Sequence, residues 1–284
     1  GTTSLQIHVQ VDAADAARAF NVAKMVSPYT VGLGANSPFL FERQLWQETR
    51  IPLFEQAVAV GGSDYSKRVT FGVRYARRSI LECFEANRLR YPVILPDVMD
   101  EPEERLAHLR LHNGTIWRWN RPLIGFDSAG RPHVRIEHRV IAAGPTPRDA
   151  MANTAFFLGL FEALMRDERD LTELLPFDAV RNSFYAAARH GLDAEVLGLE
   201  GQQQSLGSLT TERLLDLAQS GLVASGVELS EAGHWLAPIR GRVETGRTGA
   251  DWQVDWIRRH GRDFTGLVDA YFEQQSNNVP VHAW

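Results

Sequence analysis

The sequence predicts an α+β fold, in which helices cover one face of an antiparallel sheet while the other face of the sheet is polar and concave. Two segments, residues 4–11 and 133–142, alternate apolar and polar side chains with period two, which is typical of strands that bury one face. A third segment, residues 149–166, is apolar nearly all round and predicts a buried helix. Together these segments indicate a sheet with helices packed on its apolar face.

We expect a single domain over residues 1–284, with a sheet-rich part over 1–150 and a mainly helical part over 151–284. The sequence contains neither an internal repeat nor a linker of biased composition. In the helical part, residues 251–274 predict one long helix, and the polar run GQQQSLGS at 201–208 predicts a loop.

Capping and turn residues predict the other elements of the sheet-rich part. Asp12 and Asp15 are suited to cap a helix that continues to about Met25. Residues 115–119 have the composition of a strand. The run DSAG at 127–130 predicts a hairpin turn that leads into the strand at 133–142.

Composition narrows the class of protein. The net charge is −5 with both signs scattered along the chain, which argues against a nucleic-acid or membrane-surface binder. No apolar run reaches the roughly 18 residues of a membrane span. The single cysteine, Cys83, excludes an internal disulfide and suits a reducing cytoplasm, and its apolar neighbours favour a packed thiol. We therefore expect a cytoplasmic protein with small-molecule partners; a homo-oligomer is compatible with the sequence.

The two alternating strands carry the most informative polar residues. One face of the first strand presents Gln6, His8 and Gln10, and one face of the second presents Arg135, Glu137 and Arg139. In a shared sheet these faces would form one polar surface. Carboxylates bind Mg²⁺, which bridges phosphate oxygens, and arginine forks neutralise a transferring phosphoryl group. The second strand alone is equally compatible with a solvated face that bears a neutralising row of charges.

Other candidate residues have simpler interpretations. His138 projects to the apolar side of its strand and is expected in the core. The run Trp117-Arg118-Trp119 is interpreted as packing, and Arg43 and Arg50 as surface arginines unless they contact a substrate. A Walker loop, a GxGxxG fingerprint, a zinc-binding spacing and a GxSxG motif are all missing from the sequence. Nucleotide use would therefore depend on the polar face of the sheet.

At these residues the chain resembles a known family. The run RIEHR at 135–139, followed by a proline-containing turn and the apolar helix, resembles a core motif of glutamine-synthetase-like ligases. Further segments are similar, in consistent order, to the glutamate–cysteine ligase and carboxylate–amine ligase family: TTSLQIHVQV (2–11), ANSPF (35–39), RQLW (43–46), NGTIWRWNRPLIG (113–125), AARHGLDAE (187–195) and VPVHAW (279–284).

The resemblance implies an ATP-dependent ligase of glutamine-synthetase-like fold. Such an enzyme, acting in glutathione biosynthesis, would join the γ-carboxylate of glutamate to the amine of cysteine through an acyl phosphate, using ATP and Mg²⁺. The roles that it implies are Glu137 and Gln6 as metal ligands, Arg135 and Arg139 as catalytic residues that contact nucleotide and acyl phosphate, and His8, Arg43 and Arg121 as substrate-binding residues.

Two departures from the family keep alternatives open. Gln6 stands where several relatives have histidine, and a neutral amide is a weaker Mg²⁺ ligand. The family's other metal-binding carboxylates lie on strands that precede the TTSLQIHVQV-like strand, so we expect this chain to correspond to the C-terminal portion of the family's domain. The alternatives are a non-catalytic ligase-fold domain and a phosphotransferase of guanidino-kinase-like architecture.

Overall fold

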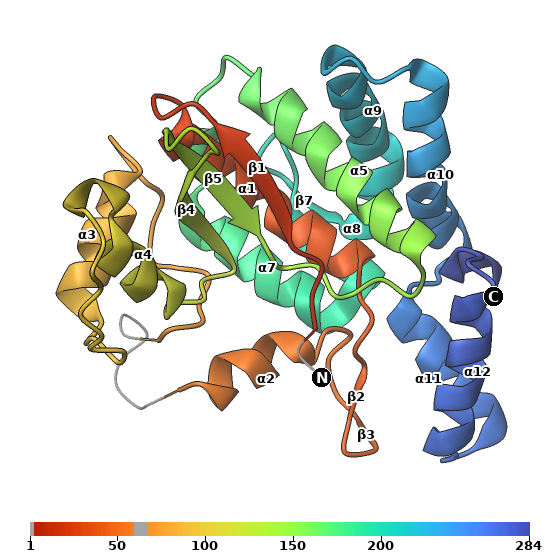
Figure 1. Cartoon of the computed structure of the whole chain (residues 1–284). Coiled ribbons are helices and arrows are strands. Elements are labelled where there is room, and N and C mark those ends of the chain that lie inside the picture. Colours follow the sequence, from red (N-terminus) through yellow and green to blue (C-terminus); the bar gives the residue numbers. More distant parts are fainter. Residues whose placement is uncertain (1–2, 60–66) are drawn as a thin grey trace. The chain divides into compact units, whose positions relative to one another are not determined.

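The computed structural model of the chain describes residues 3–59 and 67–284. It combines α-helices with small antiparallel sheets (Figure 1), which is compatible with the α+β class expected from the sequence. Across the described residues, none of the helices has both the length and the apolar character needed to cross a membrane.

Internal contacts divide the chain into two compact units. The sheet unit comprises residues 6–24 and 52–139, and the helical unit comprises residues 1–5, 25–51 and 140–284. The expectation of one ligase domain over the whole chain stays a prediction.

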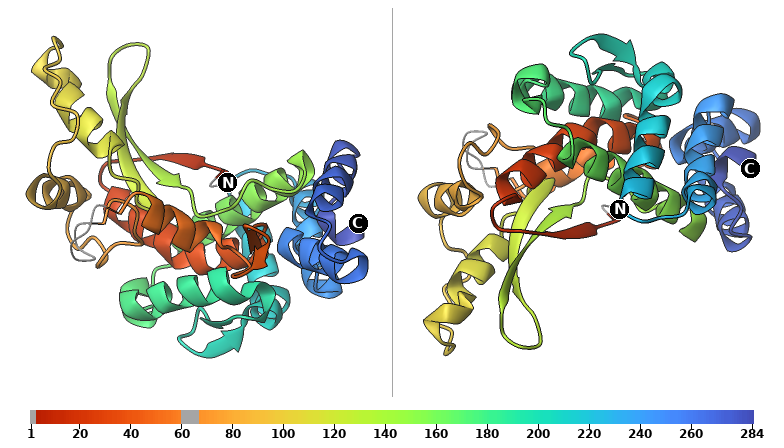
Figure 2. Two further views of the ribbon diagram at one scale, coloured as in Figure 1. Left: turned by 90° about the horizontal axis from the view of Figure 1, so that it is seen from below. Right: turned by 90° about the horizontal axis from the view of Figure 1, so that it is seen from above.

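The sheet unit contains a three-stranded sheet with the order β1-β5-β4, in which both neighbouring pairs are antiparallel. Its strands are β1 (Ile7–Val11), β4 (Asn120–Phe126) and β5 (Pro132–His138). The two alternating segments of the sequence are therefore direct neighbours, as a shared sheet requires. The predicted hairpin turn at 127–130 is also confirmed, because it joins β4 to β5 at the tip of the long yellow-green ribbon in Figure 2.

The strand predicted at residues 115–119 was placed too early, because β4 begins only at Asn120. The backbone N–H groups of Trp117 and Trp119 donate to the carbonyls of Arg68 and Thr70, at 2.8 and 3.1 Å. These residues thus pair with a neighbouring loop, where Trp119 is wholly buried, as its interpretation as a packing residue predicted.

The register of the strands separates an apolar face from a polar one. On the apolar face, Ile7 pairs with His138, and Ile136 is fully buried. His138 is also fully buried, as expected, and its Nδ1 lies 2.7 Å from Asn120 Oδ1. Burial lowers the pKa of His138 to about 3, so the imidazole is neutral in the folded protein.

The remaining elements of the sheet unit are helical: the first half of α1 (Ala16–Leu33), most of α2 (Arg50–Ala57), α3 (Leu81–Arg90), η2 (Glu103–Arg105) and α4 (Ala107–Gly114). Helix α1 continues eight residues beyond the predicted end at Met25, through Pro28. All residues from Met25 to Leu33 are buried, and this burial outweighs the local cost of the proline.

The helical unit is built mainly from helices around α5 (Pro147–Met165), which the sequence predicted at 149–166. Its other elements are β2 (Phe39–Leu40), β3 (Arg43–Gln44), α6 (Leu171–Leu174), α7 (Phe177–His190), η3 (Gly191–Asp193), β6 (Glu195–Leu197), β7 (Gln203–Ser205), α8 (Leu206–Leu209), η4 (Thr210–Leu214), α9 (Leu215–Ala224), α10 (Leu229–Thr245), α11 (Gly249–His260), α12 (Phe264–Ser276) and η5 (Val281–Ala283).

Two predictions in this unit need correction. The helix predicted at 251–274 is interrupted, since Gly261 takes a positive φ of 75° and Asp263 caps the following helix by accepting from Gly266 N at 2.9 Å. The polar run at 201–208 is more than a loop. It contains strand β7, which pairs with β6, and the start of α8.

A buried arginine ties several helices of this unit together. Arg242 on α10 is 1% exposed and donates to Asp149 Oδ1 at 2.7 Å, to Asn153 Oδ1 at 2.6 Å and to the carbonyl of Leu33 at 3.0 Å. Asp149 also caps the start of α5 together with Thr146. Each charge of this buried pair is thus hydrogen-bonded, as a buried ion pair requires.

Helices α5 and α9 pack with their backbones in contact. A Cβ atom on Gly159 would lie 2.2 Å from Ala218 O, and one on Gly221 would lie 1.9 Å from Gly159 O. Only glycine therefore permits this approach.

We expect Gly159→Ala to lower the free energy of unfolding by about 1–3 kcal/mol, because the added methyl group forces α5 and α9 apart. Gly233→Ala is the matched control: this glycine also lies inside a helix of the helical unit, but its Cβ would meet only Gln219 Nε2, at 3.6 Å. That change should stabilise the protein by roughly 0.5–1 kcal/mol. Urea denaturation measures both, and equal effects of the two substitutions would contradict the close packing.

A second prediction concerns His138 and pH. The unfolded chain binds a proton at this histidine near pH 6.5, whereas the folded chain does so only near pH 3. The neutral imidazole therefore contributes fully to the free energy of unfolding above pH 6.5, and this contribution is lost as the pH falls. Between pH 7 and pH 5 the free energy of unfolding of the wild type should fall by about 2 kcal/mol more than that of His138→Gln. Urea denaturation at both pH values checks this, and parallel losses would refute it.

Candidate functional site

The polar face of the three-stranded sheet gathers most of the residues singled out from the sequence. We define the polar face as Gln6, His8, Arg121, Arg135, Glu137 and Arg139. His8, Glu137 and Arg121 stand side by side on β1, β5 and β4, because the register pairs residue 137 with both 8 and 121. Arg135 lies one row further along, opposite Gln10 and Leu123.

Glu137 is the centre of this face and is almost completely buried, at 1% exposed. Its Oε2 forms an ion pair with Arg121 Nε. Its Oε1 lies 3.8 Å from His8 Nε2. Arg121 in turn donates to the carbonyls of Asn113 and Ile116, at 3.3 and 3.4 Å, so it is held from both sides.

Gln6 links Glu137 to Arg139. With its amide oriented to satisfy both neighbours, Gln6 donates to Glu137 Oε1 at 2.9 Å and accepts from Arg139 Nη2 at 3.3 Å. Both oxygens of Glu137 therefore face N–H donors.

Arg139 is fixed by contacts that the sequence did not reveal. It is buried, its guanidinium lies over the ring of Phe54 at 5.7 Å from the centroid, and its backbone N–H donates to Trp119 O at 3.1 Å. Phe54 was missed because it lies far away in the sequence, on α2, and no local pattern connects it to β5. A cation–π contact of this kind restrains the plane of the guanidinium.

Arg135 faces a pocket of about 690 Å³ in the sheet unit. The lining of this pocket is mainly apolar and includes Leu123 and Trp117, with Asn113 and Thr115 among its few polar side chains. The buried Nε of Arg135 has no hydrogen-bond partner within residues 3–59 and 67–284. This volume is in the range of small-molecule sites.

The electrostatics of the polar face favour anions. Three guanidinium groups surround one carboxylate, and arginine forks bind carboxylates and phosphates in two-pronged geometry. The pKa of His8 is lowered, chiefly by burial; Glu137 opposes this shift, and the three arginines add to it. The lowered pKa favours the neutral imidazole of His8, and the three arginines outnumber the one carboxylate of the face.

The same arrangement does not fit a Mg²⁺ ion. In the part of the chain that the structure describes, no three His, Cys, Asp or Glu side chains come together as a metal site. Mg²⁺ needs oxygen ligands in near-octahedral geometry, whereas both Glu137 oxygens face N–H groups and three arginines lie nearby. Glu137 and Gln6 as metal ligands stay a prediction.

Arg43 is exposed on the short strand β3 of the helical unit, and its proposed substrate contact stays a prediction. The expectation that Arg50 lies on the surface was wrong, because Arg50 is 2% exposed. It donates to the buried Glu48 at 3.2 Å, and Glu48 also accepts from Asn36 N at 2.6 Å. The ANSPF segment therefore encloses a buried ion pair of the helical unit.

Comparison with known proteins identifies a family for this chain. A family model described as glutamate-cysteine ligase family 2 (GCS2) matches residues 2–270, nearly the whole chain. Among curated proteins, the chain has no match.

The buried pair of Arg121 and Glu137 gives a direct test of the polar face. Arg121→Met leaves a buried carboxylate without its ion-pair partner, and we expect the free energy of unfolding to fall by about 3–5 kcal/mol. On the same hairpin, Arg131 pairs with Asp127 at 2.8 Å but is 81% exposed, so Arg131→Met should cost less than about 1 kcal/mol.

Urea denaturation of both variants measures the difference. The double variant Arg121→Met/Glu137→Leu should recover much of the loss, since it removes both charges. A loss in Arg121→Met no larger than in Arg131→Met would contradict the burial of this pair.

Proposed function

Because the chain belongs to glutamate-cysteine ligase family 2, a family of ligases, we propose that it is an ATP-dependent ligase that joins a carboxylate to an amine through an acyl phosphate. We propose the γ-carboxylate of glutamate and the amine of cysteine as the substrates, and a glutamine-synthetase-like arrangement as the fold. The observation that carries the proposal is the polar face, where Arg121 pairs with Glu137 across β4 and β5, and Arg135 and Arg139 flank Glu137 along the chain.

In the first step the substrate carboxylate attacks the γ-phosphate of ATP. The transferring phosphoryl group carries its negative charge on three equatorial oxygens, and preorganised cations stabilise that charge. Arg139 and Arg135 have this role in the proposal. The restraint of Arg139 by Gln6 and Phe54 supports it, because a guanidinium already held in place needs little reorganisation during the reaction.

Arg121 and Glu137 have a positioning role in the proposal. Their ion pair fixes the middle of the polar face, and Glu137 orients Gln6, which contacts Arg139. His8 is 32% exposed beside Glu137, and its neutral imidazole offers a hydrogen-bonding group to a substrate. The use of Mg²⁺ together with ATP stays an expectation from the family resemblance.

In the second step the amine attacks the acyl carbon and phosphate leaves. The acyl phosphate must be kept from water, so a substrate held in a lined pocket favours the amide over hydrolysis. The pocket beside Arg135 has the size for an amino acid or a nucleotide base.

A second candidate function is a non-catalytic binding domain that keeps the ligase fold. One observation favours it: within the described residues, Glu137 does not lie in any group of three acidic, histidine or cysteine side chains. Such a domain would bind a carboxylate or phosphate at the polar face without turning it over.

The test of the proposed function is amine-dependent ADP formation. We expect Glu137→Gln and Arg139→Ala each to lower the rate at least ~100-fold, because each removes an interaction that aligns or stabilises the transferring phosphoryl group. Arg131→Ala, on the exposed turn of the same hairpin, should leave the rate unchanged. Near-normal turnover in either polar-face variant, with the fold verified by circular dichroism, would refute the site.

Product analysis separates the candidate functions. An amide together with ADP and phosphate supports the ligase. ADP with a stable phosphorylated product would instead support a phosphotransferase of guanidino-kinase-like architecture. Absence of nucleotide binding would support the non-catalytic domain.

A further inference from the structure

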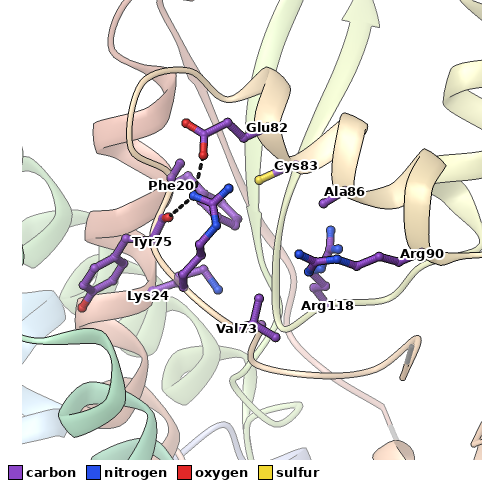
Figure 3. Close-up of a pocket in the computed structure, with 12 residues that line it drawn as sticks. Phe20, Lys24, Val73, Tyr75, Glu82, Cys83, Ala86, Arg90 and Arg118 are labelled. Carbon is purple, nitrogen blue, oxygen red and sulfur yellow. Dashed lines mark hydrogen bonds and ion pairs between the residues drawn. The ribbon is translucent and has the colours of Figure 1, made fainter. Parts of the chain in front are cut away.

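A second pocket of the sheet unit, of about 50 Å³, is lined by basic side chains (Figure 3). Lys24 comes from α1, Cys83 and Arg90 from α3, and Arg118 from the segment that precedes β4. None of these residues belongs to the polar face, and the proposed ligase reaction uses none of them.

Arg118 is a buried cation that faces this pocket. It is 7% exposed, and its guanidinium lies over the ring of Tyr91, 5.5 Å from the centroid. Across residues 3–59 and 67–284, its side chain forms neither a hydrogen bond nor an ion pair with another residue. Burying a guanidinium without a counter-charge is costly, so an anion in the pocket would stabilise this side chain.

Lys24 brings a second cation to the same pocket. It is 1% exposed, its Nζ donates to the carbonyl of Phe71, and the ring centroids of Phe20 and Phe71 lie 4.7 and 4.8 Å from it. Gly72 adopts a positive φ of 101°, and a Cβ there would lie 3.0 Å from Nζ. Burial lowers the pKa of Lys24 to about 7; Cys83 opposes the shift and Arg118 adds to it.

The nearby carboxylate does not neutralise Arg118. Glu82 lines the pocket, but its Oε2 accepts from Arg74 at 2.5 Å and its Oε1 accepts from the backbone N–H groups of residues 77, 78 and 79. These hydrogen bonds lower the pKa of Glu82 to about 2, chiefly through the N–H of Arg78. Its charge is thus committed to Arg74 and to the backbone that precedes α3.

We propose that this pocket binds a tetrahedral oxyanion of the phosphate or sulfate class between Lys24 and Arg118. The anion supplies the counter-charge that Arg118 lacks, and its oxygens accept hydrogen bonds from the guanidinium fork and the ammonium group. The volume of about 50 Å³ suits an ion of this size and is too small for a nucleotide. The site is independent of the ligase function, since its ligands lie outside the polar face.

Cys83 provides a probe of occupancy, because it is the only cysteine of the sequence and it lines the pocket. The rate of its alkylation by iodoacetamide is measured in inorganic phosphate and in sodium chloride of equal ionic strength. Calorimetric titration with phosphate gives the Kd. At a phosphate concentration ten times the Kd, we expect alkylation to slow about tenfold, because only the unoccupied pocket admits the reagent.

Variants test whether Arg118 and Lys24 cause the protection of Cys83 by phosphate. Arg118→Met and Lys24→Met should abolish the protection, whereas Arg118→Lys, which keeps the charge and the buried stem, should retain part of it. Arg105→Met is the matched control, because Arg105 also lies over an aromatic ring, that of Phe126 at 5.0 Å, but outside the pocket. It should keep the full protection.

Several outcomes would overturn the proposal. They are an unchanged alkylation rate of the wild type in phosphate, equal slowing by chloride, and protection by glutamate but not by phosphate. Full protection in a folded Arg118→Met variant would also overturn it. The wild-type measurements stand even if a methionine variant fails to fold. Because none of them depends on turnover, an inactive polar face would leave this test unaffected.

Discussion

The buried ion pair between Glu137 and Arg121 is the constraint around which the polar face is organised. Burying a carboxylate to 1% exposure is costly unless cations and N–H donors contact it. Arg121 and Gln6 both donate hydrogen bonds to Glu137, and Gln6 also accepts one from Arg139, which restrains its position. The sheet thereby holds an arginine-rich surface in a fixed geometry, and this surface is what supports the proposed chemistry of anionic substrates.

The same rule on buried charge distinguishes structural sites from candidate binding sites. In the helical unit, Arg242 with Asp149 and Arg50 with Glu48 are buried pairs whose partners both belong to the chain. They hold helices and the ANSPF segment together and leave no charge for a ligand. Arg118 lacks a partner of this kind among the described residues, and this difference is why its pocket is assigned an external anion.

Several features of the site followed from local sequence patterns. Period-two alternation predicted the strands that become β1 and β5, and it placed Glu137 and His138 on opposite faces. The hairpin turn at 127–130 also fixes how β4 pairs with β5. When Asp127 lies opposite Arg131, each step away from the turn pairs the next residue of one strand with the next residue of the other. Six such steps pair Arg121 with Glu137, which is the register observed in the structure. Turn position and the period of two fix this pairing without any tertiary contact.

The sequence by itself thus determined the α+β class, the family, and which residues share the polar face of each strand, because these depend on short-range periodicity and motif order. Only the tertiary structure decided which residues complete the sites. Phe54 contacts Arg139, and Lys24 lines the same pocket as Arg118. The residues of each pair come from segments far apart in the chain, so no local sequence pattern predicts these contacts. Burial likewise decided that α1 continues through Pro28 and that Arg50 is internal, since the environment of a residue outweighs its local propensity.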